Sequence, residues 1–400
     1  MRRTPRLLIA IIFFIALIAG ITFAIKYAKG YRPSLKNRAL EGTGLLAANS
    51  YPKGATVFIN DKLTTATDDT LNLPPGEYQV KIAKDGYISW EKTLKLEPEL
   101  VTQTNTRLFP SVPDLKPLTF SGATNPLPSP DGEKIVFSVN NATTDTKNGL
   151  YVLDLLDRPF SLNSDPRQIS RTSAKYDLVK AQLVWSPDSS QILATLNQGE
   201  TNEINLLLSP TSFTDIADFK DVTARLPVIL KEWQDIQAKK FHEQLKTLPE
   251  PMRLIATASA KMVAFSPDEK KMLYVATASA QLAENLIPSL PATSTQKQTR
   301  AIEPKNYYIY DLEEDKNFLI APFNQEAPII WYPDSNHVIM VENAKIIIAE
   351  YDATNRHTVY AGPFSQNFIF PWPNGSRLII LASLNGGSNL PPNLYSINLK

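Results

Sequence analysis

Histidine and carboxylate side chains are the residues of this sequence that suit acid–base catalysis or metal binding. The three histidines, His242, His337 and His357, lie far apart in the sequence, and no two of them share a motif. Carboxylates cluster twice, as Asp68-Asp69 and as Glu313-Glu314-Asp315, and such oxygen ligands suit hard cations. We interpret both clusters as solvated turns, with a cation site as the alternative for either.

Other signatures of catalysis are missing from the sequence. There are no cysteines, which excludes disulfides, thiolate zinc sites and thiol catalysis. No Gly-x-Ser-x-Gly elbow, Gly-x-Gly-x-x-Gly loop or Walker loop occurs. We therefore assign no catalytic, cofactor-binding or metal-ligating residue, and we expect no cofactor. The net charge is +1 and no basic stripe is present, so we expect no nucleic-acid partner.

One further set of acidic side chains recurs in a fixed setting, and it defines a repeat. Proline presets φ at the first corner of a turn, and the Asp or Asn that follows bonds its own backbone. We therefore expect each Asp to cap its own turn, far from the others, and not to join a metal site. The five copies read Leu127-Pro-Ser-Pro-Asp-Gly132, Val184-Trp-Ser-Pro-Asp188, Ala264-Phe-Ser-Pro-Asp268, Ile330-Trp-Tyr-Pro-Asp334 and Phe370-Pro-Trp-Pro-Asn374.

Apolar strands follow each copy of this turn, so the repeat must be a β unit. Four short strands separated by turns are typical of one blade of a β-propeller. The aromatic residues two positions before the motif proline, Trp185, Phe265 and Trp331, are expected to pack between blades rather than to stack on a ligand. The expected second strands cover residues 135–137, 192–194, 272–275, 338–341 and 378–381, third strands 150–153, 204–208, 307–310, 345–349 and 393–397, and fourth strands 318–320 and 358–360.

The sequence predicts about five blades over residues 111–400, with a sixth as the alternative if the long second interval hides a degenerate repeat. Intervals longer than the usual roughly 40–45 residues per blade must contain insertions. Residues 226–248 have helical periodicity, ended by Pro249 and Pro251, and residues 280–305 are typical of a long surface loop. The last repeat lacks an outer strand, and residues 116–120 are expected to supply it beside residues 393–397.

The N-terminal segment predicts a membrane anchor. Residues 7–25 contain no charge, and Arg2, Arg3 and Arg6 precede them, a run long enough to span a bilayer. A cleaved signal peptide is the alternative, but the run is long and no clear cleavage site follows it. Charge counts on the two flanks do not decide the orientation. We choose a cytoplasmic tail at residues 1–6, a juxtamembrane linker at 26–41, and the bulk of the chain outside.

Residues 42–110 predict a small β-sandwich. Turns are expected at residues 60–61, 74–76 and 84–86. A unit of this length, made only of strands, is large enough for two packed sheets. The expected strands cover residues 45–47, 56–59, 78–82, 88–90 and 94–96.

Both modules resemble known families. The segments Ser50-Tyr-Pro-Lys-Gly-Ala-Thr-Val-Phe-Ile-Asn60, Leu73-Pro-Pro-Gly-Glu-Tyr78 and Lys84-Asp-Gly-Tyr-Ile-Ser-Trp90 resemble the PEGA domain, although Lys53 stands where the naming Pro-Glu-Gly-Ala motif has glutamate. The Ser-Pro-Asp-Gly turns resemble the TolB-like propeller repeat, which only the first copy keeps in full. Together they look like membrane-anchored PEGA–propeller proteins of bacteria. The resemblance implies an envelope location and no established activity. With the predicted anchor, we expect a single-pass protein of the bacterial cytoplasmic membrane whose bulk is extracytoplasmic.

Two classes of function remain at this point. The first is a non-catalytic envelope protein whose propeller binds or scaffolds a protein or a cell-wall or surface polysaccharide. The alternative is a propeller enzyme with lactonase- or lyase-like hydrolysis in the central funnel, where at least three His, Asp or Glu side chains must converge. We favour the binding class, because turns and blade packing account for the motifs.

Overall fold

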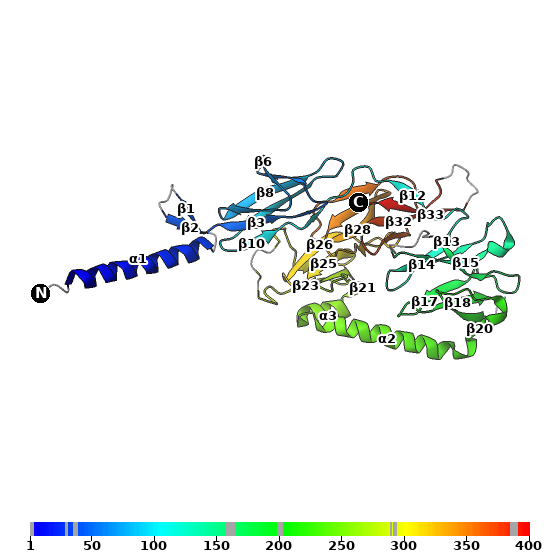
Figure 1. The fold of residues 1–400 in the computed structure, drawn as a ribbon. Coiled ribbons are helices and arrows are strands. Elements are labelled where there is room, and N and C mark those ends of the chain that lie inside the picture. Colours follow the sequence, from blue (N-terminus) through cyan, green and yellow to red (C-terminus); the bar gives the residue numbers. More distant parts are fainter. Residues whose placement is uncertain are drawn as a thin grey trace. The chain divides into compact units, whose positions relative to one another are not determined.

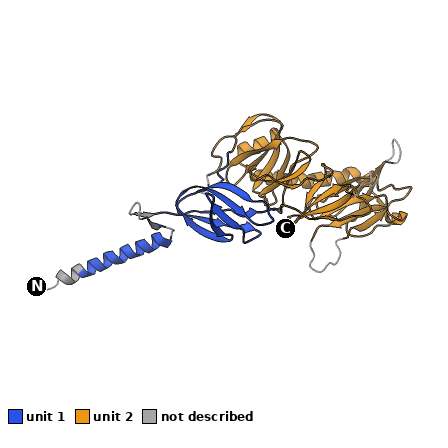
Figure 2. Cartoon of the chain, turned by 90° about the horizontal axis from the view of Figure 1, so that it is seen from above, with its two compact units in different colours: residues 1–109, 288–297 blue, residues 110–287, 298–400 orange. Residues whose placement is uncertain are grey.

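Strands carry most of the architecture in the computed structural model of this protein (Figure 1). The structure describes residues 4–28, 31–34, 39–156, 165–197, 203–288, 290, 294–384 and 391–400. The chain divides into two compact units, one of residues 1–109 and 288–297 and the other of residues 110–287 and 298–400 (Figure 2).

The first element is the apolar helix α1 (Thr4–Ala28). Its window Ile9–Ala28 has a mean hydropathy of 2.5, and none of it is buried within the protein. A helix of this length and composition is able to cross a bilayer, although a signal sequence has the same properties. The predicted apolar segment is therefore helical and extends beyond residues 7–25 at both ends.

The segment predicted as a plain linker contains local structure. Strands β1 (Arg32–Ser34) and β2 (Ala39–Glu41) pair antiparallel. The Lys26 ammonium lies 5.4 Å from the centre of the Tyr31 ring, and the Tyr31 hydroxyl donates to Glu99 Oε1 at 2.8 Å. Tyr31 therefore connects the end of the helix to the β module that follows.

The β module of this unit consists of facing sheets around one core. The larger sheet is antiparallel in the order β6 (Lys62–Ala66), β5 (Thr56–Ile59), β8 (Gly76–Ala83), β9 (Trp90–Leu96). The smaller has the order β10 (Val101–Gln103), β3 (Gly44–Ala48), β7 (Asp69–Leu73), and β11 (Thr106–Arg107) pairs β4 (Ser50–Tyr51). Leu46, Val57, Val80 and Trp90 meet in the core.

This module confirms the predicted sandwich and four of its five predicted strands, but the strand at residues 88–90 is wrong. Residues 88–89 lie between the turn and β9, which begins at Trp90 and runs through the last predicted segment. The Ile88 N–H donates to the Phe109 carbonyl instead of joining the larger sheet. The module also contains β6, β7 and β10, which were not predicted.

The described residues of the second unit contain five antiparallel sheets of four strands each, which we call blades 1 to 5. All the predicted second, third and fourth strands lie in these sheets. In order across each sheet they are β13 (Thr124–Pro128), β14 (Lys134–Val139), β15 (Gly149–Asp154) and β16 (Arg167–Arg171); β17 (Gln182–Trp185), β18 (Ile192–Asn197), β19 (Glu203–Leu208) and β20 (Lys220–Asp221); β21 (Ala260–Phe265), β22 (Lys271–Ala276), β25 (Asn306–Asp311) and β26 (Lys316–Pro322); β27 (Ile330–Trp331), β28 (His337–Glu342), β29 (Lys345–Glu350) and β30 (His357–Tyr360); and β31 (Ile369–Pro371), β32 (Arg377–Ala382), β33 (Asn393–Asn398) and β12 (Leu115–Pro117).

Blade 5 combines the two ends of this unit, as predicted. Strand β12 pairs antiparallel with β33, so that Lys116 lies opposite Ser396. The contact continues past the strand, where the Thr119 hydroxyl donates to Asn393 Oδ1 at 3.0 Å. The outer strand is shorter than expected, since Phe120 is 81% exposed and lies outside it.

Aromatic side chains join neighbouring blades. Trp185 of blade 2 donates from its indole N–H to the Leu127 carbonyl of blade 1 at 3.0 Å, and Trp331 of blade 4 donates to the Ala264 carbonyl of blade 3 at 2.9 Å. These contacts confirm that Trp185 and Trp331, two positions before the motif proline, pack between blades. Phe265 is the exception, because it packs against helical residues.

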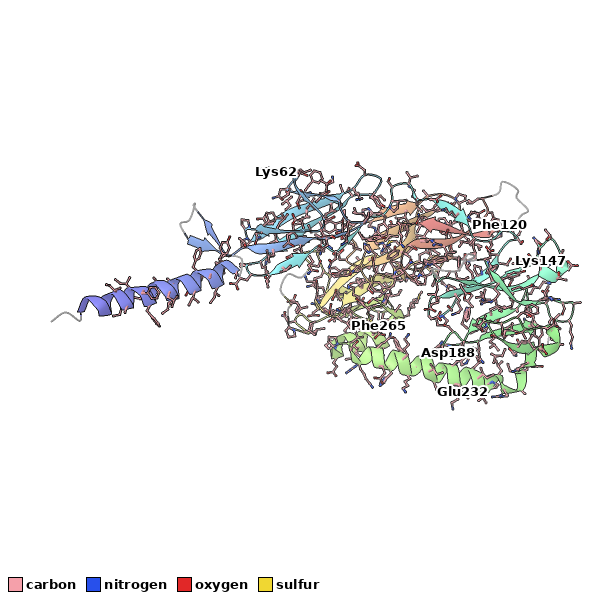
Figure 3. The ribbon with its side chains drawn as sticks, in the orientation of Figure 1. Lys62, Phe120, Lys147, Asp188, Glu232 and Phe265 are labelled. Atoms are coloured by element: carbon pink, nitrogen blue, oxygen red, sulfur yellow. The ribbon has the colours of Figure 1, made fainter. Side chains whose placement is uncertain are left out.

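Two helices stand between blades 2 and 3, where a degenerate sixth blade was the alternative. Helix α2 (Leu226–Lys246) confirms the predicted insertion, but Pro249 and Pro251 do not end the helical region, because they begin α3 (Glu250–Ala258). Backbone N–H groups in the first turn of a helix have no partner within the helix, so a proline there costs no hydrogen bond. Figure 1 shows α2 running from beside β20 to α3, and Figure 3 marks Glu232 on α2 and Phe265 beside α3.

Helix α2 is anchored only at its ends. Ile229 and Trp233 pack with Leu193 of blade 2, and Leu245 joins the cluster of α3 and blade 3. All side chains from 234 to 243 are exposed. Phe241 lies in this stretch and is 36% exposed.

The predicted loop at residues 280–305 is held at its base. Strand β23 (Ala280–Gln281) pairs with β24 (Ala301–Ile302). Arg300 forms a buried ion pair with Asp315 Oδ1 at 2.9 Å. Within the first unit, the Thr295 hydroxyl donates to the Thr93 carbonyl of β9.

Candidate functional site

The motif turns share one hydrogen-bond geometry, which confirms that each Asp or Asn caps its own turn. The residue after the Asp or Asn has φ between +59° and +74° in all five copies. The hydroxyls of Ser186 and Ser190 donate to Asp188 and hold the pKa of that carboxyl below its usual value. In each copy the N–H two residues later donates to the side-chain oxygen: Glu133 to Asp131 (3.0 Å), Ser190 to Asp188 (3.1 Å), Lys270 to Asp268 (3.2 Å), Asn336 to Asp334 (2.9 Å) and Ser376 to Asn374 (2.8 Å).

Neighbouring turns are also bonded to each other, which the sequence reading missed. The Asp131 N–H donates to the Ser189 hydroxyl at 3.1 Å, joining blades 1 and 2. The Asp268 N–H donates to the Ser335 hydroxyl at 3.0 Å, joining blades 3 and 4. Ser189 and Ser335 have a left-handed backbone, which glycine adopts more easily than serine. At both positions the serine hydroxyl accepts a hydrogen bond from the preceding blade, which a glycine could not do. The motif aspartates are structural in this arrangement.

Two of the three histidines come together, although the sequence reading treated them as scattered. His337 lies opposite Glu350 in the ladder, and His357 lies opposite Ile348, which places all three side chains on one face of blade 4. His337 Nδ1 is 2.8 Å from Asp334 Oδ2. Burial, and then the charge of His337, lower the pKa of His357. His242 is apart from this group, exposed on α2.

The acidic clusters are engaged by other side chains of the protein, and each contains a carboxylate paired with a lysine. Lys53 Nζ is 3.0 Å from Asp68 Oδ2, and Thr65 donates to Asp69 at 2.6 Å. Lys270 pairs with Glu313 at 2.8 Å. Asp315 is 4% exposed, so the prediction of a solvated turn is wrong for this residue. Among the described residues, no group of three His, Asp or Glu side chains is arranged to hold a metal ion.

A cavity of about 570 Å³ lies where blades 1, 2 and 5 meet, and we call it the central cavity. It is formed by β13, by β17 with the residues that lead into it, and by the segment before β31. This volume is typical of a small-ligand site. Its polar side chains are Asn125, Lys180, Gln182, Ser365 and Asn367, and its apolar ones include Leu127, Leu183, Val184 and Phe368.

A β-bulge aims one of these side chains. The register between β13 and β14 shifts between Thr124 and Leu127, and Asn125 within that shift has φ +50°. A bulge re-aims a side chain, and a left-handed backbone outside glycine favours Asn. Met262, also with φ +52°, occupies the matching bulge of β21.

Repeat numbering shows a signal that motif searching missed. Asn125, Gln182 and Phe368 all stand five residues before their motif proline, and all three line the central cavity. The same position is Met262 in blade 3 and Pro328 in blade 4. We call this set the channel column. Successive blades therefore present one register position toward the cavity, and its residue types vary.

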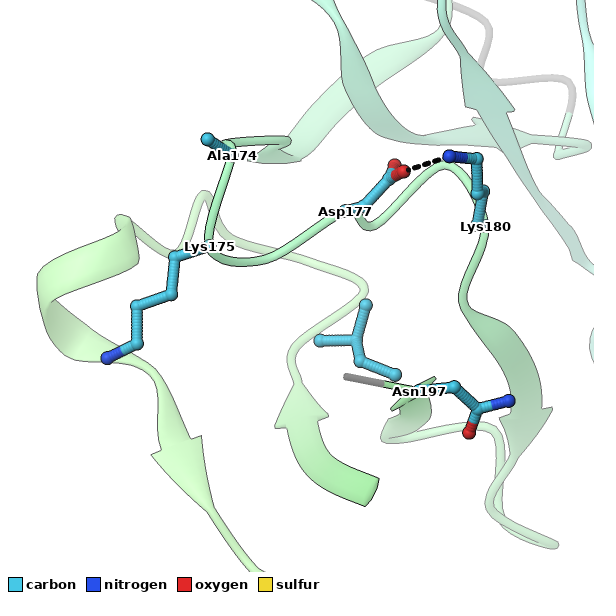
Figure 4. A pocket seen from close by; sticks show the side chains of 6 residues that line it. Ala174, Lys175, Asp177, Lys180 and Asn197 are labelled. Carbon is cyan, nitrogen blue, oxygen red and sulfur yellow. Dashed lines mark ion pairs between the residues drawn. The ribbon is translucent and has the colours of Figure 1, made fainter. Parts of the chain in front are cut away.

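A second cavity, of about 550 Å³, shares Lys180 with the central cavity. Figure 4 shows Lys180 paired with Asp177 at 2.9 Å and Asn197 on the opposite side. Lys175 points away from this pair, toward the outside (Figure 4). Exposed pairs of this kind are weak, so Lys180 is able to exchange Asp177 for a ligand group.

The central cavity is lined by amides, one hydroxyl and one ammonium group beside apolar side chains. Among the described residues that line it, Lys180 is the single charged one, and none carries a carboxylate or an imidazole. Carboxamides and hydroxyls both donate and accept hydrogen bonds. Such a lining is able to orient a polar ligand.

Comparisons with known proteins agree with the first module. The PEGA domain family matches residues 43–111, so the predicted PEGA domain is confirmed. A search of curated proteins found no relative. Solved structures similar to this chain include a putative TolB from Agrobacterium tumefaciens (13% identity, 69% of this chain, 78% of that chain, TM-score 0.22) and TolB from Acinetobacter baumannii (12%, 82%, 61%, TM-score 0.24). A hydrazine synthase from Kuenenia stuttgartiensis matches with 11% identity over 89% of this chain and 95% of that chain, at a TM-score of 0.21.

These solved structures are too remote to assign an activity. Fold and site together define a class: an apolar N-terminal helix, then a small β-sandwich, then a module of four-stranded blades. Within that class, the sandwich is a PEGA domain.

Proposed function

We propose that this is a non-catalytic binding protein of the bacterial cell envelope, anchored by α1, whose propeller holds a partner at the central cavity. The observation that carries the proposal is the lining of that cavity by amide and hydroxyl groups, two of whose amides, Asn125 and Gln182, stand at one register position of the repeat. Envelope partners of two kinds, a protein or a cell-wall or surface polysaccharide, are consistent with this lining.

The location follows from α1. The side chains of α1 from Ile9 onward are exposed over the whole apolar stretch. Exposure of apolar surface to water is unfavourable by roughly 25 cal/mol per Å². Insertion in the cytoplasmic membrane removes that area from water. We expect the bulk of the chain to lie outside the membrane.

The enzyme alternative needs groups that the cavity lacks among its described residues. A lactonase- or lyase-like reaction requires a general base or a metal beside the substrate. Three acidic groups of this unit, Asp131, Glu313 and Asp315, are bonded in a turn or paired with lysine or arginine. We therefore place the partner site and no catalytic step in the cavity.

Site-specific cross-linking tests the proposal. A photo-reactive amino acid at position 182, in full-length protein expressed in its own membrane, should give a cross-linked product on illumination. The same amino acid at Gln237, an exposed residue of α2, serves as the matched control. No product at position 182, or equal products at both positions, refutes a partner site in the central cavity.

Protease added to spheroplasts tests the location. The blades should be degraded while the cell remains closed, and the remaining fragment should keep the N-terminus. Protection of the whole chain, or a mature protein that begins near residue 26–30, contradicts an uncleaved anchor with its bulk outside.

A further inference from the structure

We propose that the central cavity binds a segment of an N-acetylated polysaccharide, an inference that rests on the proposed function and narrows its partner to one chemical class. The cavity combines free carboxamides with exposed aliphatic side chains. An acetamido sugar presents the complementary set, with hydroxyls and an amide on its edges and a methyl group and C–H faces between them.

The polar half of the match is supplied by three amides. Among the described residues, no hydrogen bond engages the side chain of Asn125 or Gln182, and both are exposed in the cavity. Asn367 accepts one bond, from the Ser365 hydroxyl at 2.8 Å, and its N–H donors are directed to no described partner. Because a carboxamide donates and accepts together, it satisfies sugar hydroxyls of either orientation.

The apolar half lies beside those amides. Val184 is 46% exposed, and Leu127 and Leu183 are half-buried around it. An aliphatic surface of this size next to amide donors suits the methyl group of an acetamide, since the methyl buries apolar area while the amide keeps its hydrogen bonds. A polysaccharide without acetamido groups leaves this surface unmatched.

An extended peptide fits the same place less well. Peptides that enter a sheet bond the backbone of an edge strand. Strand β13 is an edge strand, but Pro126 and Pro128 remove two of its N–H donors, and Asn125 breaks its register. On the β13 side the ligand is therefore recognised through side chains, whereas β17, the other edge strand that lines the cavity, contains no proline. Lys180 is paired with Asp177, so the cavity does not require a charged ligand.

Calorimetric titration of the full-length protein in lipid nanodiscs tests this inference. N-acetylchitotetraose is the probe, and cellotetraose, which lacks the acetamido groups, is its comparison. We expect the first to bind and the second to bind at least about tenfold more weakly, the difference made by one buried amide hydrogen bond.

Variants locate the site. Gln182→Leu removes one amide at similar volume, and Asn125→Gly removes another while keeping the left-handed backbone. Each should weaken binding of N-acetylchitotetraose about tenfold, and Gln237→Leu on α2 should leave it unchanged.

Three results overturn the inference: no heat with N-acetylchitotetraose, equal affinity for the two oligosaccharides, or affinities unchanged by both cavity variants. The cross-linking experiment separates this failure from that of the proposed function. A cross-linked protein at position 182 without glycan binding keeps the partner site and removes the polysaccharide.

Discussion

Replacement of Thr119 by valine tests whether the two ends of the propeller module complete one blade. The Thr119 hydroxyl donates to Asn393 Oδ1 at 3.0 Å and accepts from the Leu394 N–H at 2.9 Å, and the residue is 5% exposed. Valine keeps the shape but removes the hydroxyl, so a buried N–H loses this partner. That loss costs about 2–3 kcal/mol, which lowers the melting temperature of a module of this size by about 4–10 °C.

Scanning calorimetry of the full-length protein measures this change, and hydrogen exchange of β33 shows where it acts. Thr119→Ser is the matched control, because it keeps both hydrogen bonds and loses only a methyl group. Exchange in β33 should rise in Thr119→Val and stay near the wild-type rate in Thr119→Ser. If both variants melt within about 1 °C of the wild type, the blade does not depend on this contact and the closing role of β12 is wrong.

Three further predictions concern α2, the turns and pH. Trp233→Ala should destabilise the protein by about 2 kcal/mol, because the Trp233 ring packs on blade 2. Phe241→Ala should change the melting temperature little. Equal changes in melting temperature for the two variants contradict a helix anchored at its ends. Ser335→Ala should cost about 1–2 kcal/mol, since it deletes the hydroxyl that accepts from the Asp268 N–H, and an unchanged melting temperature argues against a bond between turns. Burial lowers the folded-state pKa of His357, so stability should fall as pH drops below about 6.5; His357→Gln should flatten that dependence in calorimetry, and an unchanged slope shows that another group titrates.

The blades were readable from the sequence because their signals are local. A turn motif fixes φ at three successive residues, and apolar strands follow it at short distances. Even the pairing of β12 with β33, remote in sequence, was predictable, since the last repeat lacked one strand and an unpaired edge is unfavourable. The aromatic column was readable for the same reason: it recurs at a fixed offset from the proline.

Signals that depend on a neighbouring element were not readable. Prolines such as Pro249 and Pro251 occur both after the end of a helix and at the start of one, so the sequence alone does not distinguish the two cases. In the structure Met252 of α3 packs in a cluster with residues of blade 3, which stabilises the second helix. The burial of Asp315 depends on Arg300, which arrives from the far end of an insertion. His337 and Glu350 lie opposite each other because of the register between β28 and β29, and no sequence motif indicates that register.

The central cavity escaped motif searching for a related reason, and it follows from how a repeat module is built. Columns that face a neighbouring blade must be filled by side chains of similar size, so Trp185 and Trp331 recur. The channel column is not held to one residue type: Asn125, Gln182 and Met262 are exposed, whereas Phe368 is 7% exposed and packs in the cluster of blades 1 and 5. It contains an asparagine and a glutamine where blades 1 and 2 border the cavity, and a phenylalanine in blade 5. In a repeat protein, one register position can line a common cavity while its residue type differs from repeat to repeat. Selection for a ligand is able to act at such a position.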